Sequence, residues 1–186
     1  MSKRLLSTAC LTVWMLTMAI IAGGCEDKLK PAVSSVVNQD LPSQESWNSK
    51  IVFSDSGRTK AILRAGHIMM FSEQRYTLLD SNVVVDFYDP QEHHTSVLTA
   101  RRGRVDDNTK NLEAFEHVVV RSDSGTTMTT EHLYWDNARQ LIHTPLYVEI
   151  VSPTEQIQGT GFESDQSLKH YTIQKVTGKA TQVDHE

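Results

Sequence analysis

The chain repeats itself about every 30 residues, and this period constrains its fold more than any other feature. Leu98-Thr99-Ala100 corresponds to Met128-Thr129-Thr130 thirty residues later, and Ile157-Gln158-Gly159 begins a further copy. An offset of 35 places an earlier copy, beginning at Leu63, onto the copy that begins at Leu98. A unit this short cannot bury its own apolar face, so we expect the copies to stack side by side.

The repeated unit has the pattern of β-strands. From Trp47 onward, short runs rich in Val, Ile, Thr, Tyr and Phe are separated by Asp-Ser-Gly, Asp-Pro, Asp-Asn and Ser-Pro turn signals. Apolar Val83 and Val85 alternate with polar residues such as Asp86, which predicts antiparallel sheets with an inward apolar face. We interpret each unit as strand, Asp or Asn turn, strand, strand, and Glu131 to Gln140 as strand then turn. Stacked copies leave open strand edges at the first and last units.

The N-terminus has the layout of a secretory signal peptide. Lys3 and Arg4 precede a mostly apolar stretch from Leu11 to Ala22, and small residues lead directly to Cys25. A cysteine after small residues resembles the bacterial lipobox and predicts lipidation of Cys25. The alternative is an uncleaved membrane anchor, although the apolar run is about 12 residues and a spanning helix needs roughly 20.

The residues that follow Cys25 bear on location and on partners. Glu26 and Asp27 resemble signals that retain a lipoprotein in the inner membrane, so we expect a lipid-anchored protein at the periplasmic face of that membrane. Removal of the signal peptide leaves 16 basic and 23 acidic residues, a net charge of −7. This balance argues against a nucleic-acid partner. Cys10 leaves with the signal, so no thiol remains for a disulfide or a metal site.

These features divide the chain into four parts. We expect, in order, a signal peptide, a lipidated flexible tether, one β-domain and a polar tail, over residues 1–24, 25–46, 47–180 and 181–186.

Catalytic and metal chemistry finds no support in the motifs. The mature part has no Gly-x-Ser-x-Gly elbow and no cysteine nucleophile, and the histidines lack repeated ligand partners. We therefore expect no enzyme activity, no cofactor and no metal site. Asp106, Asp136 and Asp165 recur at equivalent turn positions, which favours Asx turns over paired acid and base carboxylates. The cluster Arg101, Arg102 and Arg104 would suit phosphate groups, or else pairing with the chain's own carboxylates.

The repeats resemble a known family, LptC, over residues 48 to 178. The segments that carry the resemblance include Leu98-Thr-Ala-Arg-Arg-Gly-Arg-Val-Asp, Leu112-Glu-Ala-Phe-Glu-His-Val-Val-Val, Thr127-Met-Thr-Thr-Glu-His-Leu-Tyr-Trp-Asp, Leu141-Ile-His-Thr-Pro-Leu-Tyr-Val-Glu-Ile and Ile157-Gln-Gly-Thr-Gly-Phe. Their order, with a membrane anchor before one domain, is more specific than any single motif. The chain departs from better known members in having a lipobox where they keep a transmembrane helix.

The resemblance implies a fold and a role. The fold would be a twisted antiparallel β-jelly roll built from stacked strand repeats, with an apolar groove for the acyl chains of lipopolysaccharide. The chain would receive lipopolysaccharide from an inner-membrane ABC transporter complex and pass it to a periplasmic bridge protein of the LptA type. The alternative function is a structural envelope lipoprotein adaptor that scaffolds an assembly without carrying lipid.

Two sets of residues are candidates for these contacts. The groove candidates are the inward apolar residues Leu63, Met70, Val83, Val85, Val118, Val120, Val148, Ile150 and Phe162. The resemblance places the bridge protein on the C-terminal strand edge, at Thr172, Ile173, Gln174 and Lys175.

Overall fold

Nine β-strands and the turns between them make up the part of the chain that the structure, a computed structural model, describes: residues 41–181. The predicted signal peptide, Cys25, most of the predicted tether and residues 182–186 lie outside this part. The strands are β1 (Gln44–Asp55), β2 (Arg58–Phe71), β3 (Tyr76–Tyr88), β4 (His94–Asp106), β5 (Leu112–Ser122), β6 (Thr127–Asp136), β7 (Leu141–Val151), β8 (Glu155–Asp165) and β9 (Tyr171–Thr181). The all-β expectation is confirmed, and residues 131–140 form the end of β6 and a turn.

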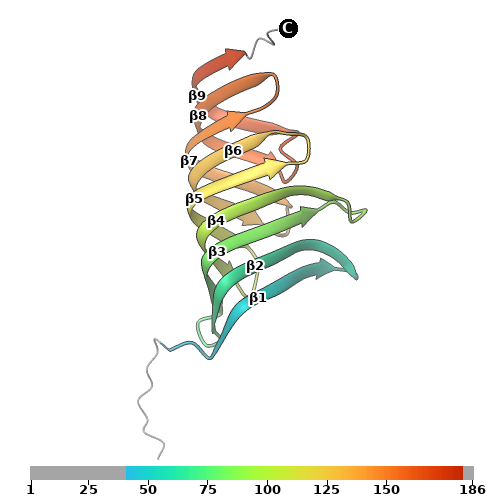
Figure 1. Cartoon of the computed structure of the whole chain (residues 1–186), viewed down its shortest axis with the longest axis vertical. Coiled ribbons are helices and arrows are strands. Elements are labelled where there is room, and N and C mark those ends of the chain that lie inside the picture. Colours follow the sequence, from blue (N-terminus) through green and yellow to red (C-terminus); the bar gives the residue numbers. More distant parts are fainter. Residues whose placement is uncertain (1–40, 182–186) are drawn as a thin grey trace, which may run out of the picture. The chain divides into compact units, whose positions relative to one another are not determined.

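The strands form one antiparallel sheet in the order β1-β2-β3-β4-β5-β6-β7-β8-β9 (Figure 1). Every strand therefore pairs only with the strands before and after it in the sequence, and tight turns join them. The repeat produces this order because each copy adds its strands to the edge left by the previous copy.

Most strands bend near their middle, and the bends divide the sheet into two arms that face each other across the core (Figure 1). The register shifts between Asp80 and Val83 on β3, and between Phe115 and Val118 on β5. Consecutive residues with positive φ lie at these two bends: Ser81 (63°) with Asn82 (58°), and Glu116 (66°) with His117 (54°). Left-handed residues interrupt the ladder and turn the strand, as in a β-bulge.

We name the arms by the strand segments they contain. The first arm holds Lys50–Asp55, Arg58–Arg64, Val83–Tyr88, His94–Thr99, Val118–Ser122, Thr127–Thr130, Tyr147–Val151, Glu155–Gly159 and Val176–Thr181. The second arm holds Gln44–Trp47, His67–Phe71, Tyr76–Asp80, Arg102–Asp106, Leu112–Phe115, His132–Asp136, Leu141–Thr144, Phe162–Asp165 and Tyr171–Ile173.

The bends correct our interpretation of the repeated unit. We expected three strands per copy, but a copy contains two long strands, each running through both arms. Leu112 and Val118, for example, both lie on β5, on opposite sides of its bend. The physical reason is that a pair of left-handed residues bends the strand without ending its hydrogen-bonded ladder.

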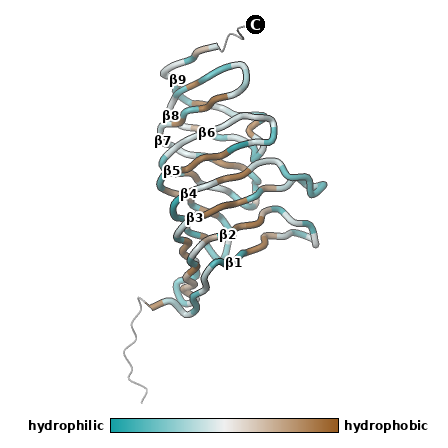
Figure 2. The backbone as a smooth tube through the Cα atoms, in the orientation of Figure 1, coloured by the Kyte–Doolittle hydropathy of each residue, from teal (hydrophilic) through white to brown (hydrophobic). Residues whose placement is uncertain are grey.

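The core lies between the two arms and contains the apolar residues that alternate along each strand. Trp135 of the second arm packs against Phe53 and Phe87 of the first arm, with ring centroids 5.6 and 5.3 Å away. Figure 2 shows apolar segments along the strands and hydrophilic turns between them. The predicted inward residues confirm this alternation: Leu63, Val85 and Leu98 are buried, whereas Arg64 and Thr99 beside them are exposed.

The recurring aspartates stabilise the turns, as expected. The carboxylate of Asp106 accepts hydrogen bonds from the backbone N–H groups of Asn108 and Thr109, and Asp136 accepts one from the N–H of Arg139. Asp165 accepts hydrogen bonds from the N–H of Lys169 and the hydroxyl of Ser167. These are Asx-type turns, and they give the aspartates a structural role.

Candidate functional site

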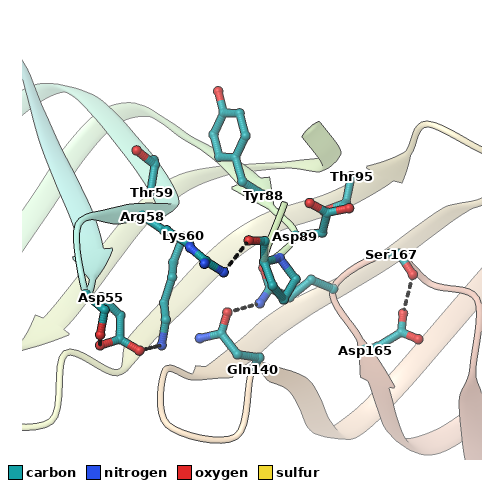
Figure 3. Close-up of a pocket in the computed structure, with 13 residues that line it drawn as sticks. Asp55, Arg58, Thr59, Lys60, Tyr88, Asp89, Thr95, Gln140, Asp165 and Ser167 are labelled. Atoms are coloured by element: carbon teal, nitrogen blue, oxygen red, sulfur yellow. Dashed lines mark hydrogen bonds and ion pairs between the residues drawn. The ribbon is translucent and has the colours of Figure 1, made fainter. Parts of the chain in front are cut away.

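A cavity of about 690 Å³ lies at the open side of the jelly roll, where turns from both arms approach each other (Figure 3). From the first arm, the β1–β2 and β3–β4 turns contribute Ser56 and Asp89, and the adjoining strand ends contribute Arg58 and Tyr88. The β6–β7 and β8–β9 turns contribute Gln140 and Ser167 from the second arm. The cavity therefore gives access from solvent to the space between the arms.

A second cavity, of about 550 Å³, lies nearer the N-terminal edge of the sheet. Its apolar lining includes Ile51 and Phe53 of β1 and Ile68 and Met70 of β2. Lys110, in the β4–β5 turn, adds a charged group at its rim. The N-terminal half of the domain thus has hollow, partly apolar space between its arms, of the size that small amphipathic ligands occupy.

The charged groups at the larger cavity are mostly paired with one another. Lys60 lies 3.3 Å from the carboxylate of Asp55, and this hydrogen bond and charge hold the pKa of Asp55 below its ordinary value. The backbone N–H of His93 donates a hydrogen bond to the carboxylate of Asp89, and this bond lowers the pKa of Asp89. Arg58 donates a hydrogen bond to the carbonyl oxygen of Pro90 at 3.2 Å. The cavity is therefore lined mainly by polar residues, whose charged groups are largely engaged within the protein.

The groove candidates fall into two classes in the structure. Met70 is partly buried and lines the second cavity. The other eight are at most 2% exposed and belong to the packed core: Leu63, Val83, Val85, Val118, Val120, Val148, Ile150 and Phe162. A ligand could contact these eight side chains only if the two arms moved apart.

The C-terminal edge is formed by β9, which pairs with β8 on one side and has no strand partner on the other within the described residues. Thr172, Gln174 and Lys175 are exposed, and Ile173 is partly buried against the core. Val176, 56% exposed, adds apolar surface to the same strand. An edge like this can pair with a strand of another protein.

Gly159 sets how closely β9 approaches β8. A Cβ atom at this position would lie 2.4 Å from Cγ2 of Ile173 and 2.6 Å from the carbonyl oxygen of Lys175. The register shifts here, between Gln158 and Gly159. The lack of a side chain at Gly159 lets the edge strand pack closely against its neighbour at this irregularity.

The arginine cluster is largely engaged by the protein's own side chains. Arg101 and Arg102 both form ion pairs with Glu116, and the guanidinium of Arg104 lies 4.7 Å from the ring centroid of Tyr76. Of the two interpretations that the sequence left open, pairing with the chain's own carboxylates describes Arg101 and Arg102.

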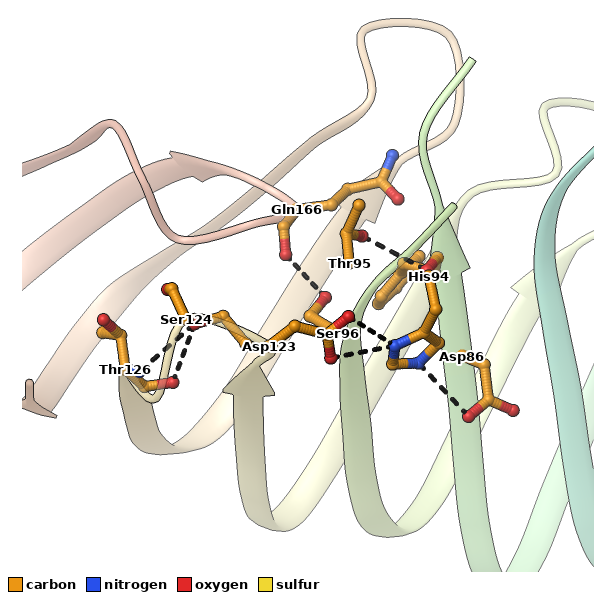
Figure 4. Close-up of polar contacts among 10 residues, drawn as sticks. Asp86, His94, Thr95, Ser96, Asp123, Ser124, Thr126 and Gln166 are labelled. Carbon is orange, nitrogen blue, oxygen red and sulfur yellow. Dashed lines mark hydrogen bonds and ion pairs between the residues drawn. The ribbon is translucent and has the colours of Figure 1, made fainter. Parts of the chain in front are cut away.

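Several histidines also pair with carboxylates. Nδ1 of His94 lies 2.9 Å from the carboxylate of Asp123, and its Nε2 lies 3.7 Å from that of Asp86 (Figure 4). In residues 41–181, no group of three or more His, Cys, Asp or Glu side chains is arranged to hold a metal ion.

Four residues that matter for the interior were not among the site residues predicted from the sequence: Ser96, Trp135, Gln166 and Leu168. All four are buried, and the hydroxyl of Ser96 donates to the backbone oxygen of Gln166 at 2.6 Å. This contact joins residues 70 positions apart. No local pattern could have identified it, because it depends on how the two arms face each other.

Within residues 41–181 there is no helix with the length and apolarity needed to span a bilayer.

Comparisons with known proteins place the chain in a family. A search of curated proteins finds no relative that matches the chain. Residues 8–181, by contrast, match the family described as "Lipopolysaccharide-assembly, LptC-related", a family of transport components associated with the periplasm and the inner membrane. The match covers nearly the whole chain, so this protein belongs to the LptC family and takes part in lipopolysaccharide transport.

Proposed function

We propose that this protein holds lipopolysaccharide between the two arms of its sheet, receives it from an inner-membrane ABC transporter complex and passes it to a periplasmic bridge protein at the β9 edge. A lipid on Cys25 would hold the domain at the periplasmic face of the inner membrane. ATP hydrolysis would occur in the transporter, so the role of this chain is to shield acyl chains from water. Such shielding needs apolar surface and no cofactor.

The observation that carries the proposal is the pair of cavities between the arms in a member of this family. The cavity of about 690 Å³ has a mainly polar lining, and the cavity of about 550 Å³ adds apolar residues such as Ile51 and Met70. Lipopolysaccharide is itself polar at one end and apolar at the other. The apolar core continues from these cavities along the sheet, so separation of the arms would expose a continuous apolar path toward β9.

Photo-crosslinking tests whether lipid enters this interior. A crosslinking residue at Met70, Val120 or Val148 should capture lipopolysaccharide in cells, and capture should depend on ATP hydrolysis by the transporter. Thr99 is the matched control because it is exposed and points away from the core on β4. A lack of crosslinks at every inward position would contradict transport and favour the structural adaptor, which scaffolds an assembly without carrying lipid.

Proline substitution tests the proposed hand-over at the β9 edge. Gln174 has no register partner on β8, so Gln174→Pro should disturb the β8–β9 ladder little while it interrupts pairing with an added strand. We expect loss of binding to the bridge protein in a pull-down, with an unchanged circular dichroism spectrum. Gln174→Ala removes the side chain but keeps the backbone N–H, so it should bind normally. Normal binding by the proline variant would exclude this edge as the docking site.

A further inference from the structure

Two side-chain hydrogen bonds join the two arms, and both involve the segment from β8 to β9. The hydroxyl of Ser96, on β4 of the first arm, donates to the backbone oxygen of Gln166 in the β8–β9 turn of the second arm (Figure 4). The hydroxyl of Tyr171, on the second arm, donates to Oε1 of Glu155 on the first arm at 3.1 Å. Toward the N-terminal edge, by contrast, the second cavity separates the arms, and the larger cavity opens beside the β8–β9 turn itself, at Gln166 and Ser167.

The β8–β9 turn also fills the interior with an apolar side chain. Leu168 is 3% exposed and belongs to the core cluster, although it lies in a turn. Its φ is 56°, in the left-handed region that a bulky residue adopts only at a cost. Backbone strain of this kind is common in segments that switch between two arrangements.

The same turn contains a buried polar group with no partner. The side chain of Gln166 donates from Nε2 to Oε1 of Gln140 at 2.6 Å. The amide of Gln140 in turn donates to the backbone oxygen of Asn137, which fixes the orientation of both amides. Oε1 of Gln166 is thereby left buried and without a hydrogen bond. An unpaired buried oxygen destabilises the closed turn relative to a state in which water reaches it.

We infer that the β8–β9 turn, residues 166–170, is a movable clasp that closes the C-terminal half of the interior and must be displaced before a lipid can pass toward β9. The inference rests on the proposed function, because it assumes a ligand between the arms. Leu168 occupies the path, and the bond from Ser96 keeps the turn closed. The strained φ of Leu168 and the unpaired oxygen of Gln166 lower the free-energy cost of opening the turn.

Ser96→Ala should loosen the clasp, and Ser122→Ala is its matched control. Ser122 is a buried serine opposite Ser96 in the β4–β5 register, but its hydroxyl bonds within its own hairpin, to Ser124 and Thr126. In hydrogen exchange on the full-length protein, Ser96→Ala should speed exchange of the Leu168 amide about fivefold, the effect of one hydrogen bond. Ser122→Ala should leave that amide unchanged. Equal effects of the two variants on Leu168 would overturn the inference.

Crosslinking in cells separates the clasp from the proposed function. Met70 lies at the second cavity and Ile173 lies beyond the clasp, and both are partly buried against the core. Ser96→Ala should raise capture of lipopolysaccharide by a crosslinker at Ile173 relative to capture at Met70. Tyr171→Phe should have the same effect, because it removes the hydrogen bond between Tyr171 and Glu155 that also joins the arms. If a crosslinker at Met70 captures lipopolysaccharide in the otherwise wild-type protein but neither variant changes the ratio of capture at Ile173 to capture at Met70, the inference of a clasp is wrong. If no inward position captures lipid, the proposed function itself fails.

Discussion

At the scale of a single residue, Trp135 is a contact that holds the two arms together. It is 1% exposed, and its ring packs against Phe53 and Phe87 of the opposite arm. Its indole N–H has no hydrogen-bond partner among the described residues. The ring therefore stabilises the fold through packing alone, and its polar atom contributes nothing favourable.

Substitution of Trp135 tests this division. Trp135→Ala should lower the free energy of unfolding by about 3–5 kcal/mol, because it leaves a large cavity between the arms. Trp135→Phe should cost clearly less, since it keeps an aromatic ring and removes the unpaired N–H. Trp47, 63% exposed and stacked on His67, provides the control, and Trp47→Ala should cost less than about 1 kcal/mol. Urea unfolding measures the free energy of unfolding of all three variants. If Trp135→Phe lowered it as much as Trp135→Ala, the indole N–H would have a hydrogen-bond partner.

Asp106 connects a turn to the pH dependence of stability. The backbone N–H of Thr109 lowers the pKa of its carboxyl below the ordinary value of 3.8, partly opposed by desolvation. A carboxyl with a lowered pKa stabilises the fold above its ordinary pKa, and this contribution is lost as the pH falls through the lower folded value. Acid should therefore weaken the wild type below about pH 4.

Asp106→Asn isolates this contribution, because the amide oxygen can still accept the turn's hydrogen bonds but does not titrate. The urea midpoint of Asp106→Asn should fall less than that of the wild type between pH 6 and pH 3. Asp106→Ala should be less stable than both at pH 6. An identical pH dependence in the wild type and the asparagine variant would show that Asp106 is not responsible.

At the scale of elements, the seating of β9 on β8 depends on the space left by Gly159. The nearest atoms to a Cβ at this position, on Ile173 and Lys175, both belong to β9. A side chain there must push the edge strand away, and β9 is the strand proposed to contact the bridge protein. The close approach therefore links one glycine to the geometry of the docking edge.

Gly159→Ala should loosen β9, whereas Gly178→Ala should not. At Gly178 the nearest atom to a new Cβ would be Oε1 of Gln158 at 3.4 Å, which is ordinary contact at the end of a flexible side chain. Trypsin cleavage after Lys175 and Lys179 should become faster in the first variant only. Equal cleavage rates in both variants would mean that β8 and β9 adjust to the added methyl group.

At the scale of the whole molecule, one sheet forms both walls of the interior. Each strand runs through both arms, so the walls can separate only by a change at the bends, such as the one at Ser81 and Asn82. The open edges at β1 and β9 lie at opposite ends of this interior. This arrangement suits a component that receives a ligand at one end and passes it on at the other.

The proposed lipid anchor gives a prediction for the full chain. Mass spectrometry of the protein from membranes should show that residues 1–24 are absent and that Cys25 carries a diacylglycerol. Cys25→Ala should prevent both modifications, whereas Cys10→Ala should not, because Cys10 lies within the predicted signal peptide. An intact N-terminus in the wild type would favour the uncleaved anchor instead.

The sequence by itself determined the strand content, the facing of residues such as Val85 and Leu98, and the aspartate turns at Asp106 and Asp165. These features are local: alternation along an extended chain and hydrogen bonds within a few residues express them directly. The family also followed from the order of the repeats. The bends did not, because Ser81, Asn82, Glu116 and His117 carry no signal that separates a left-handed pair inside a strand from a turn between strands.

Only the tertiary structure decided which inward residues line open space and which are packed. Met70 and Val83 follow the same alternation, yet Met70 lines a cavity and Val83 is fully buried. The contacts of Ser96 with Gln166 and of Trp135 with Phe53 were equally hidden. Burial between two facing arms depends on side chains far apart in the sequence, and the alternation along one strand contains no information about the arm opposite.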